Sequence, residues 1–162
     1  PLRGGKYSLY EAGTRVPFFV YWKGKIKPTV SDALVCQLDI MASVAALIKK
    51  TLKGAYDSQN LLATFLGKSK KGREDLVIEG TPQRLAFRKD NWILIPPHGG
   101  RKISITGIDL GNLDEYGLYD ISNDISQKKC LAKIYPQKLV ELKKIFYDKV
   151  QGYYHPENAI SW

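Results

Sequence analysis

The chain of 162 residues carries a formal net charge of +9, and 44% of its residues are hydrophobic and 25% are charged. These proportions are typical of a soluble globular protein, and the aromatic share of 11% argues against disorder. No apolar run reaches the roughly 18 residues that a membrane-spanning helix needs, so we expect no membrane partner.

The positive charge attracts anions in general, but the lysines are scattered along the chain. The densest basic runs are residues 68–73 and the pair Lys143 and Lys144. No zinc finger, helix-turn-helix or aromatic RNA-binding motif accompanies them. A solvated basic surface is therefore favoured, and we expect no nucleic-acid partner.

Cysteines and histidines are too few for an obvious metal site. Cys36 and Cys130 form no metal-ligand spacing, and we expect both to be buried thiols. His98 and His155 lie far apart in the sequence. The sequence therefore predicts no metal bound by this chain.

The first third of the chain predicts a strand followed by a helix. Residues 16–22 form a nearly continuous apolar run, which is typical of a strand covered on both faces. Ser31 and Asp32 are good helix-start residues, and apolar side chains recur behind them at steps of three and four up to Ile48. Strand and helix are half of an α/β unit, so this third predicts the end of a larger domain.

Short strands are predicted beyond a basic loop at residues 67–72. They are residues 75–79, 84–88, 92–95 and 117–121, with a polar turn at residues 88–91. The long loop 96–116 contains a possible extra strand at residues 103–106.

A helix is predicted from Pro136, with an apolar stripe made by Leu139, Leu142, Phe146 and Val150. Glu141 is placed to pair with Lys144 on the solvent side of this helix. Strands followed by a helix predict a small antiparallel sheet with the helix packed on one face.

The opening residues carry the most specific signal. Residues 5–17 read G-K-Y-S-L-Y-E-A-G-T-R-V-P, and they closely resemble the segment K-x-x-x-Y-E-G-G-x-R-V-P of type I, formylglycine-dependent sulfatases, the arylsulfatase family. Five further segments resemble sulfatase motifs in the family's order: 22–26, 38–43, 57–67, 85–95 and 117–132. The chain departs from these motifs at Lys23 for proline, Ala42 and Ser43, Ile93 for lysine, Ile125 for proline, Gln127 for glutamate and Cys130 for asparagine.

The resemblance extends from Lys6 to about Val150 and implies an α/β fold class, present here as an α+β fragment. Residues 1–67 would be the end of the large alkaline-phosphatase-like α/β domain. Residues 68–162 would be a small C-terminal subdomain with a four-stranded antiparallel sheet and a packed helix. The start at Pro1, without a methionine, suggests a processed or excised piece.

The resemblance also implies a chemistry, the hydrolysis of sulfate esters through a formylglycine and a calcium ion. Lys6 alone maps onto the family's catalytic residues, as a compact ammonium that contacts sulfate oxygens. Tyr10, Glu11 and Arg15 are predicted to position the loop of Lys6, with an ion pair possible between Glu11 and Arg15. Formylglycine and calcium would belong to the missing N-terminal catalytic domain, so we expect neither in this chain and expect the isolated fragment to be inactive.

Two other places in the sequence invite a catalytic interpretation. Residues 80–84 resemble the C-T-P-x-R nucleophile motif with glycine in place of cysteine, and we interpret this match as coincidence in a turn. His98 and Arg101 are candidate substrate-binding residues of the long loop, although an exposed turn with incidental charge is favoured. Arg84 and Arg88 are predicted to lie on the surface of a strand.

Alternatives remain for the function of the parent protein. Its substrate is a sulfated glycan or an aryl or alkyl sulfate. A phosphoester or phosphonate hydrolase of the same superfamily is one rival, and a non-catalytic module that binds anions or glycans is another. The family resemblance suggests a periplasmic or secreted location. Because the predicted strand and helix of the first third lack neighbours, we expect self-association through exposed apolar surface and partial disorder of residues 1–15.

Overall fold

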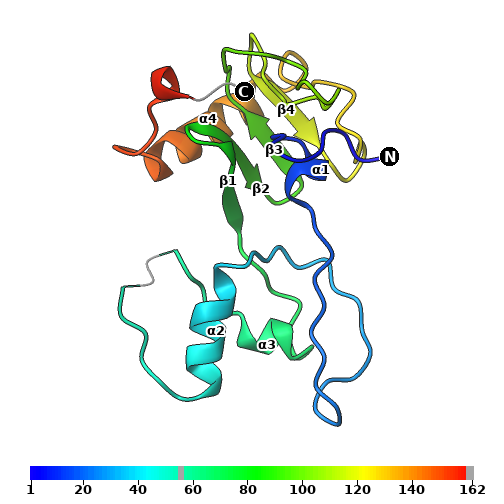
Figure 1. Ribbon diagram of the computed structural model, residues 1–162, viewed down its shortest axis with the longest axis vertical. Coiled ribbons are helices and arrows are strands. Elements are labelled where there is room, and N and C mark those ends of the chain that lie inside the picture. Colours follow the sequence, from blue (N-terminus) through cyan, green and yellow to red (C-terminus); the bar gives the residue numbers. More distant parts are fainter. Residues whose placement is uncertain (55–56, 160–162) are drawn as a thin grey trace. The chain divides into compact units, whose positions relative to one another are not determined.

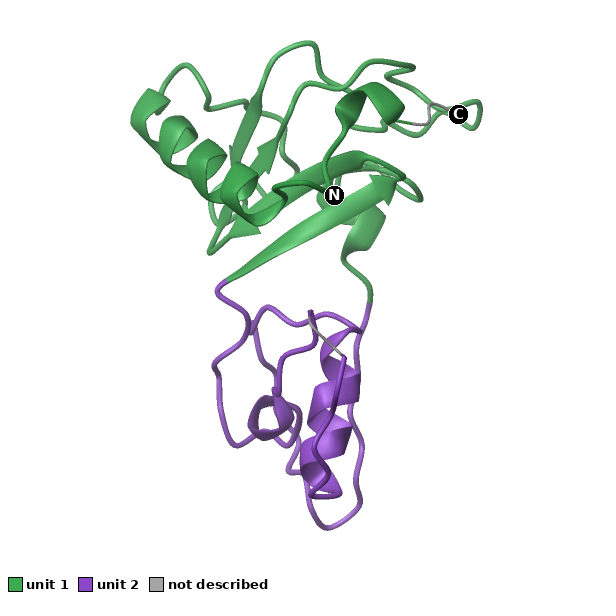
Figure 2. Ribbon diagram, turned by 90° about the vertical axis from the view of Figure 1, so that its left-hand side faces the viewer, with its two compact units in different colours: residues 1–16, 75–162 green, residues 17–74 purple. Residues whose placement is uncertain are grey.

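The computed structural model describes residues 1–54 and 57–159. The chain divides into two compact units, which Figure 2 colours separately. The sheet unit comprises Pro1–Val16 and Asp75–Trp162, and the helical unit comprises Pro17–Glu74. The predicted division near residue 67 concerns the domains of the whole protein and stays a prediction. In the described ranges, no helix combines the length and the apolar character needed to cross a membrane.

The sheet unit is built on four antiparallel strands in the order β1-β2-β3-β4 (Figure 1). The strands are β1 (Asp75–Thr81), β2 (Arg84–Lys89), β3 (Trp92–Ile95) and β4 (Gly117–Asp120). Asp90 turns the chain between β2 and β3 with a φ of 53°, a conformation that aspartate tolerates better than most residues. The predicted four-stranded antiparallel sheet is therefore confirmed.

One face of the sheet packs against α4 (Pro136–Lys149). Because side chains alternate along a strand, Phe87, Leu94 and Leu118 all point to this face. There they form one apolar cluster with the α4 residues Leu142 and Phe146. The predicted helix and its packing are confirmed, but Glu141 pairs with Lys138 instead of Lys144, at 2.9 Å between Lys138 Nζ and Glu141 Oε2.

The opposite face of the sheet packs against the N-terminal segment. Ala86, Ile93 and Tyr119 point to this face and form a second cluster with Leu9 and Tyr10. The short helix α1 (Glu11–Thr14) follows directly. The expectation of partial disorder over residues 1–15 is wrong, because Leu9 and Tyr10 lie in the core.

The helical unit contains α2 (Asp39–Leu47) and α3 (Leu62–Phe65). The strand predicted over residues 16–22 is wrong, because no strand of the described residues pairs with this run and its side chains are exposed. The helix starts later than Ser31 and Asp32 predict. Asp39 sets the start, since its Oδ2 accepts the Cys36 N–H at 3.0 Å across the first turn.

The remaining connections are irregular. The strand suggested at residues 103–106 is reduced to a single bridge between Ile103 and Asp109, and a short 3-10 helix, η1 (Pro156–Asn158), lies near the end of the chain. The prediction of two buried thiols is wrong for Cys130, which is exposed, and Cys36 is partly buried. Cys130 follows the sheet on a loop, where no neighbouring layer covers it.

Candidate functional site

Lys6 lies on a tight turn whose backbone is fixed. The Ser8 N–H donates to the Gly5 carbonyl at 2.9 Å, and Tyr7 has a φ of 72°. A positive φ at this place is unusual for tyrosine and is a strained backbone conformation. The Lys6 side chain is exposed, with Nζ 5.0 Å from the centroid of the Tyr7 ring. The turn therefore presents an ammonium group to solvent from a defined backbone.

Two glycines allow other backbone segments to approach this turn. A Cβ atom at Gly13 would lie 2.1 Å from the Ser8 carbonyl oxygen, and one at Gly80 would lie 2.7 Å from the Tyr7 carbonyl oxygen. Both distances are shorter than real Cβ contacts, so only glycine fits without movement of the turn. Gly80 belongs to the segment that resembles a nucleophile motif, and its close approach to Tyr7 gives the glycine a structural role.

Arg3 ties the N-terminal segment to two loops beyond the sheet. Its Nε donates to Asp109 Oδ2 at 2.8 Å and its Nη1 donates to the Gln127 carbonyl at 2.7 Å. The guanidinium also lies 4.0 Å from the centroid of the Tyr10 ring. Burial alone would lower the pKa of Arg3, but the hydrogen bond to Asp109 and the attraction of nearby acidic groups together outweigh it, and the pKa is raised. Arg3 therefore remains charged and holds the segment that leads to Lys6.

Glu11 is the second anchor of this segment, and its side chain is only 3% exposed. Its Oε2 lies 3.1 Å from Arg15 Nη1, and its Oε1 lies 3.8 Å from Arg88 Nη1. The backbone N–H of Glu11 donates to Gln127 Oε1 at 2.8 Å. The ion pair considered between Glu11 and Arg15 is present. Arg88, predicted on the strand surface, is half-buried beside Glu11, and burial lowers its pKa while Glu11 partly offsets this.

Tyr10 completes the anchoring beneath the turn. Its hydroxyl lies 3.5 Å from that of Tyr119, and the two rings meet edge to face. Burial and this hydrogen bond raise the pKa of Tyr10, so the phenol stays protonated. Tyr10, Glu11 and Arg15 thus lie in the segment that carries Lys6, as expected, while their positioning role stays a prediction.

Sequence reasoning missed four residues that hold the same segment: Arg3, Asp109, Tyr119 and Gln127. Their contacts join positions more than 100 residues apart in the chain, which no local pattern reveals. For Gln127 a signal existed, because it stands where the sulfatase motif has glutamate. An acceptor is needed there for the Glu11 N–H, and the amide oxygen of Gln127 supplies it.

His98 and Arg101 have unlike environments. His98 is buried, and its Nε2 lies 3.0 Å from the Leu85 carbonyl, so Nε2 must carry the proton in this contact. Burial lowers the pKa of His98, which favours the neutral ring. Arg101 is exposed. The favoured interpretation as an exposed turn is therefore wrong for His98, which packs edge-on against Tyr154, whereas Arg101 is open to solvent.

The prediction that Arg84 lies on the surface of a strand is also wrong. Its side chain is fully buried, and Nη2 donates to the Leu110 carbonyl at 2.8 Å while Nη1 donates to Thr81 Oγ1 at 3.1 Å. Burial lowers the pKa of Arg84. The residue points between β2 and the long loop, because the loop covers this end of the sheet.

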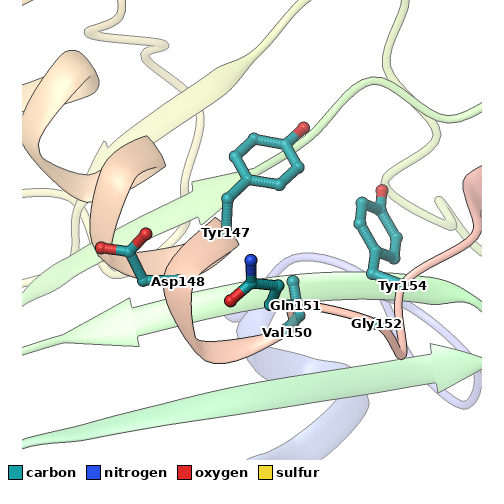
Figure 3. A pocket seen from close by; sticks show the side chains of 6 residues that line it. All are labelled: Tyr147, Asp148, Val150, Gln151, Gly152 and Tyr154. Atoms are coloured by element: carbon teal, nitrogen blue, oxygen red, sulfur yellow. The ribbon is translucent and has the colours of Figure 1, made fainter.

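A shallow hollow of about 330 Å³ lies where α4 ends. Figure 3 shows the Tyr147 and Tyr154 rings pointing the same way, from the last turn of α4 and from the loop that follows it. The hollow at the end of α4 is lined by Tyr147, Asp148, Val150, Gln151, Gly152 and Tyr154. A second hollow of about 430 Å³ is lined by Pro1, Leu2, Arg3, Ser126 and Lys128. Neither hollow is lined by Lys6, His98 or Arg101.

Clustered metal-ligating side chains are the next feature to consider in this chain. Within the described ranges, no three side chains of histidine, cysteine, aspartate or glutamate come together as metal ligands. Neither Cys36 nor Cys130 stands in a C-x-P-x-R segment.

Comparison with known proteins identifies the family. A family model described as "Sulfatase" matches residues 1–50, which include the turn of Lys6. An N-acetylgalactosamine-6-O-sulfatase of Bacteroides thetaiotaomicron is 45% identical over 146 residues, which are 88% of this chain and 29% of that protein. The chain belongs to the sulfatase family.

Other relatives and solved structures agree with this assignment. An arylsulfatase of Hemicentrotus pulcherrimus is 36% identical over 72% of this chain and 20% of that protein. A solved sulfatase structure from Bacteroides thetaiotaomicron, titled for the metabolism of multiple glycosaminoglycans, is 44% identical with a TM-score of 0.85, over 91% of this chain and 32% of that one. A sulfatase from Pseudoalteromonas sp., 20% identical over 93% of this chain and 32% of that one, shares the fold with a TM-score of 0.68.

The family's alkaline-phosphatase-like α/β fold class and the identity of this chain as a C-terminal sulfatase portion are therefore confirmed. The chain spans less than a third of the relatives it matches.

Proposed function

We propose that this chain is part of an enzyme that hydrolyses sulfate esters, and that Lys6 is its contribution to the active site. The observation that carries the proposal is the turn of Lys6. Its ammonium is exposed on a backbone that Ser8 closes and that Arg3 and Glu11 anchor at either side. An anchored turn with an exposed cation suits a residue that must meet an anion in a fixed geometry.

The role proposed for Lys6 follows from the charge of the reacting group. A sulfate ester is an anion, and electron density moves onto its oxygens as the ester bond breaks. An ammonium placed against one of those oxygens stabilises this change and donates hydrogen bonds to it. Tyr10, Glu11 and Arg15 act indirectly, by fixing the turn.

The nucleophile and the metal of this reaction are proposed to lie in the rest of the polypeptide. A formylglycine would supply the attacking oxygen there, and a calcium ion would polarise the sulfate. The missing N-terminal catalytic domain is therefore the proposed partner of this chain. Without it, the 162 residues should be inactive.

The proposed substrate is a sulfated glycan with a sulfated amino sugar. This rests on the name of the relative with 45% identity, an N-acetylgalactosamine-6-O-sulfatase. Arg101, which is exposed, is the better placed of the two predicted substrate-binding residues, and His98 would act only by supporting the loop. A periplasmic or secreted location is proposed from the family resemblance.

A chimeric enzyme tests the proposal. Residues 1–162 replace the matched part of the Bacteroides relative, and turnover of 4-nitrophenyl sulfate, 6-sulfated N-acetylgalactosamine and 4-nitrophenyl phosphate is measured. We expect activity on the sulfate esters. Lys6→Ala should lower kcat by about 100- to 1000-fold, the usual cost of removing one group that stabilises a developing oxyanion. Lys50→Ala, at another exposed lysine, is the matched control and should leave kcat unchanged.

Two results would contradict the proposal. A Lys6→Ala chimera with full activity would remove Lys6 from the active site. A wild-type chimera that turns over neither sulfate ester would show that residues 1–162 do not complete a sulfatase active site.

A further inference from the structure

Three tyrosine rings meet where α4 ends. The hydroxyl groups of Tyr116 and Tyr147 lie 2.8 Å apart, and the ring centroids of Tyr147 and Tyr154 lie 6.2 Å apart at 44°. Phe146, which is fully buried, packs against Tyr147 at 5.1 Å and against Tyr154 at 5.4 Å between ring centroids. Tyr147 is nevertheless 42% exposed. The core therefore fixes these rings from within, while part of their surface is open to solvent.

Hydrogen-bonding groups lie beside the rings. Asp148 and Gln151 are exposed and, with Tyr147 and Tyr154, line the hollow of about 330 Å³ (Figure 3). Burial and the hydrogen bond with Tyr116 raise the pKa of Tyr147 to about 12, so its phenol is neutral at physiological pH. The hollow thus combines an aromatic surface with a carboxylate, an amide and a neutral hydroxyl group. Such a mixture of apolar and convergent polar groups is typical of a small-ligand site.

A lysine adds positive charge to the same surface. Lys143 precedes Tyr147 by one turn of α4, so the two side chains lie on one side of the helix. The Nζ atom of Lys143 lies 4.0 Å from the centroid of the Tyr116 ring, whose hydroxyl is hydrogen-bonded to Tyr147. The ammonium group is therefore held beside the aromatic surface. We call six residues the α4 tyrosine surface: Tyr116, Lys143, Tyr147, Asp148, Gln151 and Tyr154.

The exposed apolar side of α2 has a different character. The buried residues of α2 are polar, Asp39 and Ser43, while Met41, Val44 and Ile48 are between 47% and 60% exposed. Side chains of this kind offer no strong hydrogen bonds, as expected for the end of a larger domain. In the α4 tyrosine surface, polar and charged groups accompany the rings. This surface therefore suits a hydrophilic ligand instead.

We propose that the α4 tyrosine surface binds a sulfated sugar chain. A sugar ring has a flat face of C–H groups and a rim of hydroxyl groups. The C–H face matches the electron-rich face of the Tyr147 ring, and the rim matches the hydrogen-bonding side chains of Asp148 and Gln151. Lys143 supplies the cation for a sulfate group on the same sugar or the next one.

The spacing of the rings determines how the sugar binds. Carbon atoms in contact lie about 3.5–4.0 Å apart, so a sugar held between two aromatic rings needs centroids roughly 7–8 Å apart. Tyr147 and Tyr154 are closer than this, at 6.2 Å, and they are tilted. The sugar therefore stacks on the exposed side of Tyr147, and Tyr154 extends the same platform. Removal of the Tyr147 ring should thus weaken binding the most.

The α4 tyrosine surface is separate from Lys6. Phe146 packs on one face of the four-stranded sheet, and Leu9 and Tyr10 of the segment that carries Lys6 pack on the opposite face. A sugar bound at α4 therefore leaves the turn of Lys6 open. A second binding place of this kind raises the affinity for a long glycan while a sulfate elsewhere on it reacts. The inference rests on the proposed function only in the choice of a sulfated glycan as the ligand.

A nucleic acid fits this surface less well. Bases also stack on tyrosine rings beside a cation. A nucleic acid, however, carries a phosphate at every nucleotide, and the carboxylate of Asp148 repels it. A glycan carries sulfate at some positions and hydroxyl groups at others, and a hydroxyl group can donate to the carboxylate. Asp148 thus favours a sugar chain.

Calorimetric titration tests the proposal. The protein is the chimeric enzyme with Lys6→Ala, so that the probe is not hydrolysed. The probe is a chondroitin 6-sulfate tetrasaccharide, which contains 6-sulfated N-acetylgalactosamine. We expect a binding event at the α4 tyrosine surface besides any at the active site. Tyr147→Ala should weaken this event by about 5- to 100-fold, the usual range for loss of a stacked aromatic ring, whereas Tyr147→Phe keeps the ring and should bind nearly as well as the parent chimera.

Two further variants make the titration specific. Tyr135→Ala is the matched control, at a tyrosine just before α4 that is 47% exposed, and it should leave binding unchanged. Lys143→Gln should weaken the same event as Tyr147→Ala for the sulfated probe but not for an unsulfated chondroitin tetrasaccharide. Thermal unfolding checks that each variant is folded. If Tyr147→Ala does not fold, Lys143→Gln and Gln151→Ala decide in its place, and normal binding by both would overturn the proposal.

The other outcomes are equally decisive. Equal binding by the Tyr147→Ala and Tyr135→Ala proteins would overturn the proposal. Tighter binding of a thymidine tetranucleotide in the same event would also overturn it, because the ligand would then be a nucleic acid. Turnover of 4-nitrophenyl sulfate by the chimera that retains Lys6 is scored separately. An inactive chimera that still shows the event removed by Tyr147→Ala would count against the proposed function and leave the sugar site intact.

Discussion

Arg73 and Asp39 form a buried ion pair in the helical unit, with Nη2 of the arginine 2.6 Å from Oδ1 of the aspartate. The two side chains are 8% and 0% exposed. The carboxylate also accepts the N–H groups of Cys36 and Gln59. One side chain thus joins the start of α2 to the segment before α3 and to Arg73, in a unit that has no fully buried apolar residue among those described.

Asp39→Asn should destabilise the helical unit. Removing one partner of a buried ion pair typically costs about 3–5 kcal/mol, because the other charge is left without compensation. Hydrogen exchange by mass spectrometry should show loss of protection in residues 36–54 and 57–61, with protection in β1–β4 unchanged. Asp32→Asn, at an exposed aspartate of the same unit, is the control. Equal protection in the Asp39→Asn and Asp32→Asn variants would show that the pair does not hold the unit together.

The helical unit should also lose stability in acid. Burial alone would raise the pKa of Asp39, but the hydrogen bonds from Arg73, Cys36 and Gln59 outweigh it and lower the pKa. The folded state therefore binds fewer protons than the unfolded state. The stabilisation is complete above the unfolded pKa of about 3.9 and is lost as the pH falls through the lower folded value.

A pH series of hydrogen exchange, corrected for the intrinsic exchange rate, measures this loss. Protection of residues 36–54 and 57–61 should fall below about pH 4 in the wild type, and the Asp39→Asn variant should not show this step. A step of the same size in both proteins would assign the acid sensitivity to another group.

Gly13→Ala should destabilise the sheet unit although alanine is the better helix former. Glycine to alanine inside an exposed helix usually stabilises by up to about 1 kcal/mol. Here the new Cβ would lie 2.1 Å from the Ser8 carbonyl oxygen, and overpacking of this kind costs about 1–3 kcal/mol. Thermal unfolding should show a lower Tm, and the chimeric enzyme should lose kcat because the turn of Lys6 moves.

Gly99→Ala is the control for this change, since a Cβ there meets no atom within 4 Å. A Gly13→Ala protein with an unchanged or higher Tm would mean that the helix and the turn do not approach as closely as described.

Arg84→Met and Arg84→Ala should change the free energy of unfolding by different amounts or in opposite directions. Within the described ranges Arg84 Nε has no hydrogen-bond partner, and the Leu110 carbonyl that accepts from Nη2 also accepts the Leu9 N–H. Methionine fills much of the space without a charge, so the free energy of unfolding should change by less than about 1 kcal/mol or rise. Alanine leaves a cavity and should cost about 2–5 kcal/mol. Urea unfolding of both variants measures the difference, and a large loss in Arg84→Met would show that the charge itself is needed.

The sheet unit was largely predictable from its sequence. The strands and α4 carry clear periodicity, and they bury their apolar residues against partners within the same 162 residues. The family segment predicted that Lys6 lies on a loop, and the structure places it on a tight turn. The network beneath the turn did not, because Arg3, Asp109 and Gln127 meet only through tertiary contacts.

The helical unit was predicted less well for a physical reason. The apolar run at residues 16–22 reads as a buried strand, but a strand needs a hydrogen-bonded neighbour and the described residues offer none. The start of α2 depends on Asp39 as an acceptor for Cys36, whereas Ser31 and Asp32 only match the composition of a helix start. Arg84 and His98 were placed on the surface because polar residues usually lie there, but the long loop covers Arg84 and His98 packs against Tyr154.

The inward polar side of α2 has a consequence for synthesis of the protein. A helix whose apolar side faces away from its own unit buries little apolar surface when that unit folds alone. It should therefore be the last part of the chain to fold. As the C-terminal portion of a sulfatase, this segment leaves the ribosome after the bulk of the polypeptide, which folds as it emerges.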